Sequence, residues 1–346
     1  MTSLQSLLGI ELPIVQAPMA GVQGSALAVA VSNAGALGSL PCAMLSIDAM
    51  RDELSAIKAG TARPFNVNFF CHTAPEPDAA REAAWRSALA PYYREFGLDP
   101  SEVRAGPGRS PFSHEAADAL AEIRPAVVSF HFGLPSAELV ARVRAWGSKI
   151  VSSATTVEEA LWLEARGVDV IIAQGLEAGG HRGMFLSADL TTQVGTFALL
   201  PQIVAAVRVP VIAAGGIGSA RGVAAAIALG AAGVQLGTAY LLCPEATTSA
   251  VHRAAIRSNA ARHTALTNLF TGRFARGIVN RLMRELGPIS ASPPAFPLAT
   301  AAIAPLRAAA ESRGSGEFSP LWSGQNVGGC REMPAAELTR DLASEL

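Results

Sequence analysis

The stretch VIAAGGIGSARGVAAAIALGAAGVQLGT, residues 211–238, carries the pattern that decides the fold. An apolar run at 211–214 ends in a glycine pair, and an alanine-rich segment of helical period follows at 219–229. A second apolar run at 234–236 then ends in Gly-Thr. Continuous apolar runs are typical of strands in a parallel sheet that is buried on both faces. We therefore read this stretch as one strand–helix–strand unit.

The same alternation occupies much of the chain. Expected strands lie at 14–18, 36–40, 65–70, 127–131, 150–154, 168–173, 211–214 and 234–236. Helical patterns lie between them at 25–33, 46–59, 113–123, 136–146, 156–165 and 219–229, several of them opened by a capping Ser or Thr. Eight such alternations predict an α/β fold, the (β/α)8 TIM barrel, with an open doubly wound sheet as the alternative.

Two segments depart from this alternation. Residues 72–112 are rich in proline, with a helical pattern at 79–90, and are expected to form an insertion after the third strand. Residues 243–346 contain further helical patterns and Pro/Ser-rich loops, and are expected to form a helical lobe over the barrel mouth. We therefore predict a barrel domain over 1–242, which includes the insertion, and a C-terminal lobe over 243–346.

Composition excludes several classes of protein. The chain of 346 residues has 27 basic and 28 acidic side chains, so neither nucleic acid nor a membrane surface is an expected partner. The four cysteines lie far apart without a CxxC pair, which predicts neither a disulfide framework nor a metal site. They favour a reducing compartment, and the N-terminus lacks the pattern of a signal peptide. We expect a cytoplasmic protein.

A phosphate site is expected after the last two strands. Functional groups in a TIM barrel gather at the C-terminal ends of its strands, and phosphate commonly binds after strands seven and eight. Gly215-Gly216 and Gly237-Thr238 follow those strands, and glycines let backbone N–H groups approach a phosphate closely. The alternative is that these are tight turns that only close the fold.

Other strand ends carry polar amides and apolar side chains. Asn68 and Gln174 can each donate and accept hydrogen bonds, while Pro18 and Met19 offer an apolar wall. Together with the phosphate loops these residues suit flavin mononucleotide (FMN), which has one phosphate and a flat heterocycle. Taken singly, each amide could equally cap a turn.

His181 is the candidate catalytic residue. It lies between glycines in the segment EAGGHRG, which we expect to form a mobile loop, and histidine suits proton transfer near neutral pH. Glu177 is close in sequence, but no further clustered ligands suggest a metal. His131 ends a strand and is expected to line the same pocket. The alternatives are a structural loop histidine and a core histidine, respectively.

These residues resemble those of the nitronate monooxygenase family, formerly called 2-nitropropane dioxygenases, and within it the class I members. The resemblance runs from about residue 4 to about residue 330. Its motifs are QAPMAG (16–21), NVNFFCH (66–72), SFHFG (129–133), QGLEAGGHRG (174–183), AAGGI (213–217), QLGT (235–238) and LWSGQ (321–325). The APM and AAGGI segments occur more widely among flavin barrels, whereas EAGGHRG is specific.

The resemblance implies an FMN-dependent enzyme that oxidises alkyl nitronates with O2 to a carbonyl compound and nitrite. His181 would be the base that deprotonates neutral nitroalkanes, with a kcat/KM that rises with pH in the ordinary histidine range, and His131 would be a pocket residue. The expected FMN-binding set is Ala17, Pro18, Met19, Asn68, Gln174, Gly179, Gly180, Gly215, Gly216, Gln235, Leu236, Gly237 and Thr238. A homodimer is one option for its assembly.

Three other functions remain open at this stage. Two are flavin enzymes on a similar barrel, an NAD(P)H:quinone reductase and an enoyl-thioester reductase, and the third is a non-catalytic FMN-binding protein. A relative of IMP dehydrogenase is excluded because no cysteine lies between Cys71 and Cys243 to serve as the loop nucleophile. The chain also departs from the family in one respect. Family pockets often use tyrosine, and this chain has only Tyr92, Tyr93 and Tyr240.

Overall fold

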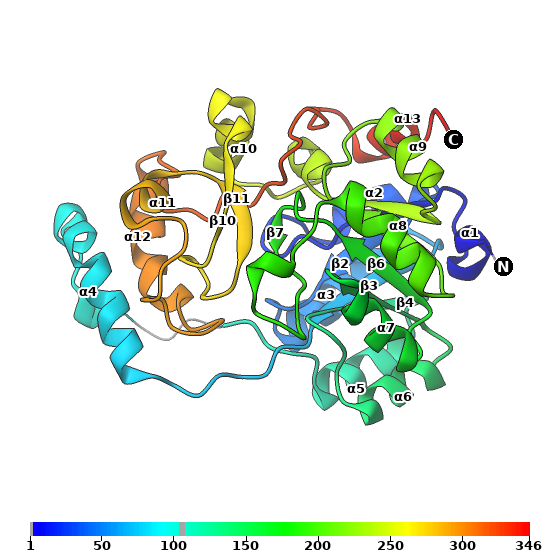
Figure 1. Ribbon diagram of the computed structural model, residues 1–346, viewed down its shortest axis with the longest axis horizontal. Coiled ribbons are helices and arrows are strands. Elements are labelled where there is room, and N and C mark those ends of the chain that lie inside the picture. The colour runs from blue at the N-terminus through cyan, green and yellow to red at the C-terminus, as the bar shows by residue number, and fades with distance from the viewer. Residues whose placement is uncertain (1–2, 104–107) are drawn as a thin grey trace.

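Eight parallel strands form the barrel in the computed structural model, which describes residues 3–103 and 108–346 (Figure 1). Their order is β1-β9-β8-β6-β5-β4-β3-β2, and a parallel bridge between Val15 and Leu37 joins the two end strands. The strands are β1 (Ile14–Gln16), β2 (Gly38–Pro41), β3 (Phe65–Phe70), β4 (Val127–His131), β5 (Lys149–Ala154), β6 (Val170–Gln174), β8 (Val211–Ala214) and β9 (Gly233–Leu236). The predicted TIM barrel is confirmed.

Helices surround the sheet as the sequence predicts, with one addition. They are α2 (Ser25–Asn33), α3 (Ile47–Gly60), α5 (His114–Ile123), α6 (Ala137–Ala145), α7 (Val157–Ala165), α8 (Thr196–Ala206) and α9 (Ala220–Ala228). Side-chain caps open five of them, at Ser46, Ser113, Ser136, Thr156 and Ser219. The sequence did not predict α8, because Gly195 gives it no side-chain cap and Pro201 interrupts its pattern.

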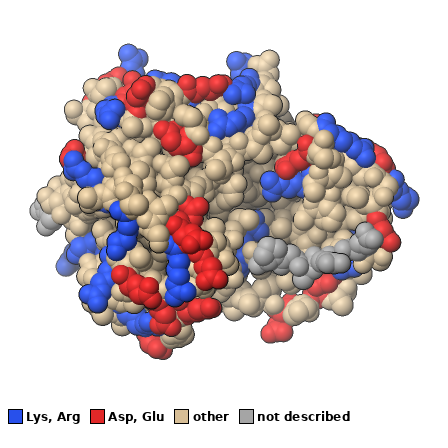
Figure 2. All heavy atoms as spheres, turned by 180° about the vertical axis from the view of Figure 1, so that it is seen from behind, with Lys and Arg blue, Asp and Glu red and all other residues tan. Residues whose placement is uncertain are grey.

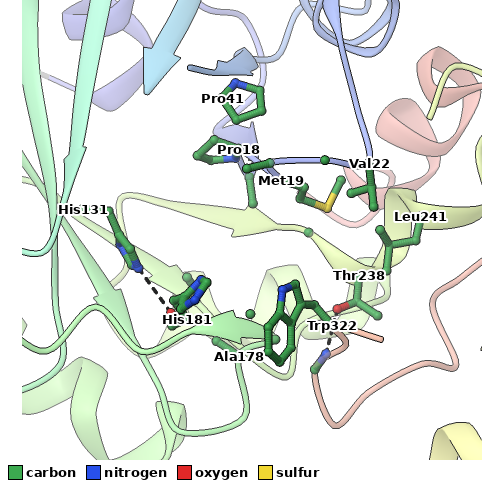
Figure 3. A pocket seen from close by; sticks show the side chains of 18 of the residues that line it. Pro18, Met19, Val22, Pro41, His131, Ala178, His181, Thr238, Leu241 and Trp322 are labelled. Atoms are coloured by element: carbon green, nitrogen blue, oxygen red, sulfur yellow. Dashed lines mark hydrogen bonds between the residues drawn. The ribbon is translucent and has the colours of Figure 1, made fainter. Parts of the chain in front are cut away.

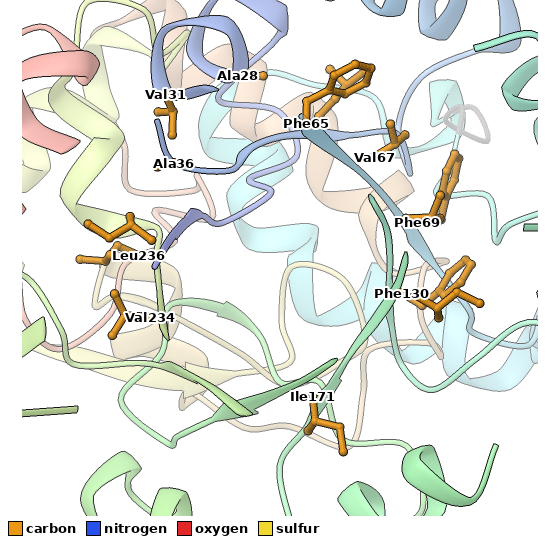
Figure 4. Packing of buried hydrophobic residues seen from close by; sticks show 14 of the residues in the cluster. Ala28, Val31, Ala36, Phe65, Val67, Phe69, Phe130, Ile171, Val234 and Leu236 are labelled. Atoms are coloured by element: carbon orange, nitrogen blue, oxygen red, sulfur yellow. The ribbon is translucent and has the colours of Figure 1, made fainter. Parts of the chain in front are cut away.

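Apolar side chains fill two spaces around the strands. One cluster lies between strands and helices and includes Val67, Phe130 and Val234, each no more than 1% exposed (Figure 4). A second cluster contains Val151 and Ile212 from the strands, together with side chains of the short helix α1 (Leu4–Leu8). Each such burial contributes about 1.5–3 kcal/mol to folding. The core therefore holds the strand ends, and the loops that follow them, in fixed positions.

A smaller lobe lies beside the barrel mouth (Figure 1). The insertion contributes α4 (Ala79–Phe96), which packs on α12 (Thr300–Ser312). Trp85 Nε1 donates to the Ala299 carbonyl at 3.2 Å, and the Tyr93 hydroxyl donates to the Ala302 carbonyl at 2.7 Å. Its other elements are α10 (Ala250–Arg257), α11 (Arg281–Leu286), β10 (Thr264–Thr267), β11 (Ala275–Ile278) and β7 (Gly180–His181). Two distant segments thus build one lobe.

The end of the chain returns to the barrel. Helix α13 (Ala335–Leu342) packs against α2 and α9, and the Thr339 and Tyr240 hydroxyl oxygens lie 2.9 Å apart. Short 3₁₀ turns complete the fold at η1 (Pro100–Glu102), η2 (Leu190–Thr192), η3 (Thr238–Leu242) and η4 (Asn259–Arg262). The domain division at residues 242 and 243 remains a prediction, and residues 104–107 of the predicted insertion lie outside the described part.

Charge is dispersed over the surface. Figure 2 shows basic and acidic side chains interspersed on one face of the molecule. In the described ranges, no helix is long and apolar enough to cross a membrane. Within the same ranges, no three His, Cys, Asp or Glu side chains are grouped as metal ligands, and all four cysteines are free thiols.

Candidate active site

A cavity of about 250 Å³ opens at the C-terminal ends of the barrel strands and extends to side chains of the lobe. Pro18, Met19 and Val22 lie on one side of it, and His181 and Trp322 lie on the opposite side (Figure 3). The structure brings all the predicted site residues to its lining: Ala17, Pro18, Met19, Asn68, His131, Gln174, Gly179, Gly180, His181, Gly215, Gly216, Gln235, Leu236, Gly237 and Thr238.

The two glycine loops present unused donors to this cavity. Gly215 and Gly216 have φ angles of 116° and 73°, values that glycine adopts without strain. Among the described residues, the backbone N–H groups of Gly216 and Gly237 donate to no protein acceptor. The Thr238 hydroxyl accepts a hydrogen bond from Gly324 N at 2.9 Å, which leaves its own proton available. Such donors suit a phosphate.

A late segment of the chain fixes these loops, and sequence reasoning did not assign it a role. Asn326 Nδ2 donates to the Gly216 carbonyl at 2.8 Å, and Gln325 N donates to the Glu177 carbonyl at 3.0 Å. A Cβ on Gly179 would lie 2.4 Å from Gly324 N, so the contact requires glycine. The motif LWSGQ was the only signal in the sequence that marked this segment. It did not indicate which loops the segment contacts.

The three amide side chains of the site differ in their hydrogen-bond partners. Gln174 is already engaged, with Nε2 donating to the His181 carbonyl at 3.0 Å and Oε1 accepting from Gly183 N at 2.7 Å. Asn68 donates from Nδ2 to Ser129 Oγ at 2.9 Å. Gln235 Oε1 is buried and has no partner among the described residues. An unpaired buried acceptor is unfavourable, and because protein atoms cover Gln235 Oε1, this oxygen is not presented to the cavity.

His181 lies on a strand, and the prediction that this segment forms a mobile loop is wrong. Gly180 and His181 form β7, which pairs with Arg276 and Ala275 of β11. The partner residues lie about a hundred positions away in the sequence, so local glycine content could not reveal the pairing. The backbone of the candidate base is therefore held in a three-stranded sheet.

Hydrogen bonds leave one nitrogen of His181 available. Its Nε2 lies 3.0 Å from Thr271 Oγ1, and that hydroxyl donates to the Arg273 carbonyl at 3.3 Å. Thr271 therefore accepts from Nε2–H, and Nδ1 carries the lone pair. Nδ1 has no hydrogen-bond partner among the described residues and is not among the buried unpaired atoms. This is the tautomer that a general base at Nδ1 requires.

The environment keeps His181 neutral. Its ring is within 6.1 Å, centroid to centroid, of Phe70, Phe296 and Trp322. Burial lowers the pKa of His181 well below its usual value, and the positive charge of Arg109 lowers it further. Neutral imidazole is the form that accepts a proton, so His181 is in the protonation state that the predicted role requires.

His131 holds the neighbouring backbone and cannot replace His181 as it stands. Its Nε2 lies 3.2 Å from the His181 carbonyl oxygen, which can only accept, so Nε2 is the donor. Its Nδ1 lies 2.6 Å from Ser153 Oγ, which must then donate. Burial lowers the pKa of His131 to about 3. Both nitrogens are engaged, consistent with the predicted place in the pocket lining.

Arginine lines the cavity and tyrosine does not. Tyr92 and Tyr93 pack in the lobe core, and Tyr240 is buried beside Thr339. Arg109, from the end of the insertion, is instead part of the cavity lining. Sequence reasoning did not single it out, because no pattern places this irregular segment relative to the barrel.

The barrel has a buried histidine and a set of unused backbone donors at its C-terminal mouth, an arrangement typical of (β/α)8-barrel enzymes. The family model described as nitronate monooxygenase matches residues 1–345. The chain belongs to this family of flavin-dependent oxidoreductases.

Individual relatives agree over the full length. A nitronate monooxygenase from Pseudomonas aeruginosa is 44% identical, with 98% of this chain and 97% of that protein covered. One from Paraburkholderia phytofirmans is also 44% identical, with 99% and 94% covered. A solved structure of nitroalkane oxidase from Streptomyces ansochromogenes is 40% identical and has a TM-score of 0.89. The match covers 100% of this chain and 98% of that chain.

Proposed function

We propose that this chain uses FMN to oxidise alkyl nitronates with O2, giving a carbonyl compound and nitrite, and that it also accepts neutral nitroalkanes. One observation carries the proposal. His181 Nδ1 and the N–H groups of Gly216 and Gly237, which have no partners among the described residues, line a single cavity. A base for a C–H proton and donors for a phosphate are thus within one ligand's reach.

The residues present fit FMN. The amides of Gly215, Gly216 and Gly237 and the Thr238 hydroxyl would hold its phosphate. Gln235, which is part of the cavity lining, would contact the heterocycle. Ala17, Pro18, Met19, Asn68, Gln174, Gly179, Gly180 and Leu236 would complete the site. Bound FMN supplies the electron-accepting chemistry that no side chain offers.

The protein's own contribution is proton transfer and exclusion of water. A nitronate has already lost its α-proton, so it needs only to be bound. A neutral nitroalkane must first transfer that proton to Nδ1 of His181, and the C–H electron pair becomes the C=N bond as negative charge moves to the nitro oxygens. The aromatic walls around His181 shield this step from solvent.

The direct test is turnover by the purified, FMN-loaded protein. We expect a yellow protein that releases FMN and not FAD on denaturation, since only one phosphate site is available along these strand ends. With nitroethane nitronate it should consume O2 and release nitrite and acetaldehyde in equal amounts. A protein that cannot be loaded with FMN, or that retains FMN without releasing nitrite, would contradict the proposal.

A further inference from the structure

Arg109 reaches the cavity from the insertion, and hydrogen bonds hold both the backbone that follows it and its own side chain. After it, Ser110 N donates to the Ala43 carbonyl at 3.2 Å, and Phe112 N donates to the Phe70 carbonyl at 2.8 Å. Its own Nη1 donates to Thr300 Oγ1 at 3.1 Å. The guanidinium carbon lies 5.7 Å from the centre of the Phe296 ring. The side chain is thus held at the cavity lining.

The Arg109 guanidinium has no carboxylate partner among the side chains that the structure describes. Among the described side chains, no carboxylate lies within 4 Å of it. By contrast, Arg281 has Glu95 at 2.7 Å, and Arg307 has Glu311 at 2.8 Å. Burial lowers the pKa of Arg109 to about 10, with the positive charge of Arg307 as a further cause, so it stays charged at neutral pH. A partly buried charge without a counter-ion is costly unless a ligand supplies one.

The phosphate loops are too far around the barrel to supply that counter-ion. Arg109 is tied to the end of β3, and the glycine pair follows β8, which is four strands away in the closed order of eight. His181 is nearer, since its ring centre lies 5.3 Å from the Phe296 ring that Arg109 also faces. The missing anion therefore belongs beside the candidate base, across the mouth from the phosphate.

We propose that Arg109 binds the two oxygens of the nitro group, as a fork, when they carry the negative charge of a nitronate. This inference rests on the proposed function and assigns its substrate-binding residue. The planar guanidinium has five N–H donors, and two of them can meet two oxygens of one anion. When a neutral nitroalkane loses its proton to His181, the same oxygens gain the charge, so Arg109 stabilises the anion as it forms.

The test compares Arg109→Gln and Arg109→Lys with the control Arg313→Gln, which removes a charge from an exposed position outside the cavity. The probe is sodium nitrite, a bent anion with two oxygens, and its Kd is measured by calorimetry on FMN-loaded protein. We expect the Kd of nitrite to rise roughly 10- to 100-fold in Arg109→Gln. Arg109→Lys keeps the charge without the fork and should give a smaller rise, while Arg313→Gln matches the wild type.

Kinetics separate binding from a merely structural role. In Arg109→Gln the KM for a nitronate should rise with the nitrite Kd, while the KM for the neutral nitroalkane changes little and its kcat falls. Equal rises in both KM values would overturn the proposal, as would an unchanged nitrite Kd. If Arg109→Gln does not fold, an unchanged nitrite Kd in Arg109→Lys overturns the fork. Wild-type protein that fails to turn over nitronate refutes the proposed function alone, because the nitrite Kd still tests Arg109.

Discussion

At the scale of single residues, His181 combines a fixed backbone with one free nitrogen. The β7–β11 ladder and the hydrogen bonds from Gln174 and His131 to its carbonyl region hold the main chain. Thr271 determines which ring nitrogen carries the proton. A base held in this way should matter only when a proton has to move.

Replacement of His181 by Asn tests that role. Turnover of a neutral nitroalkane should fall by about 10²–10⁴-fold, the usual contribution of a positioned base, while turnover of the pre-formed nitronate falls much less. The measurement is nitrite release with each substrate at equal FMN content. Equal losses with both substrates would mean that His181 positions the ligand or acts electrostatically, and no loss with either substrate would mean that His181 is not the base.

The pH dependence should differ from the ordinary histidine titration that sequence reasoning predicted. Burial and nearby positive charge lower the pKa of His181 well below 6.5, so its ionisation moves to more acidic solution than the ordinary histidine range. We expect kcat/KM for the neutral nitroalkane to be flat between about pH 6 and 7.5, and to fall only in more acidic solution. A midpoint near 6.5 that disappears in His181→Asn would show that the base is not desolvated in the working enzyme.

At the scale of elements, the glycine turn after β8 lies in the cavity lining, and its role in holding a phosphate remains a prediction. Gly216→Asp should abolish retention of FMN, because its Cβ would lie 3.5 Å from Glu177 Cβ and would place a second carboxylate at the turn that we expect to hold the phosphate. Gly314→Asp is the matched control, since Gly314 has the same φ of 73° and open space around it, but lies outside the cavity lining. Both variants carry the same backbone strain. Normal flavin content in Gly216→Asp would mean that the phosphate binds elsewhere.

Strands and helices with a strong local pattern were predictable to within a few residues. The run at 65–70 became β3, and Ser219 caps α9 as expected. Elements without such a pattern were missed. Helix α8 carries an internal proline, and β7 has two residues whose pairing depends on a partner far along the chain. Local propensity cannot specify pairings of that kind.

At the scale of the whole molecule, the predicted residues do meet, because parallel strands of a barrel deliver their C-terminal ends to one mouth. What the sequence could not reveal is how the lobe completes that mouth. Asn326 reaches Gly216 and Arg109 arrives from the insertion, and neither contact follows from local spacing. Family pockets often use tyrosine, but in this chain all three tyrosines pack away from the cavity.

Anaerobic mixing of the FMN-loaded protein with one electron donor at a time shows which molecule reduces the flavin. In a stopped-flow instrument without oxygen, an alkyl nitronate should cause rapid loss of the oxidised-flavin absorbance, and NADH or NADPH at the same concentration should cause little. This result would identify the nitronate as the reductant. Rapid bleaching by NAD(P)H with none by nitronate would contradict the account and identify a reductase built on the same barrel.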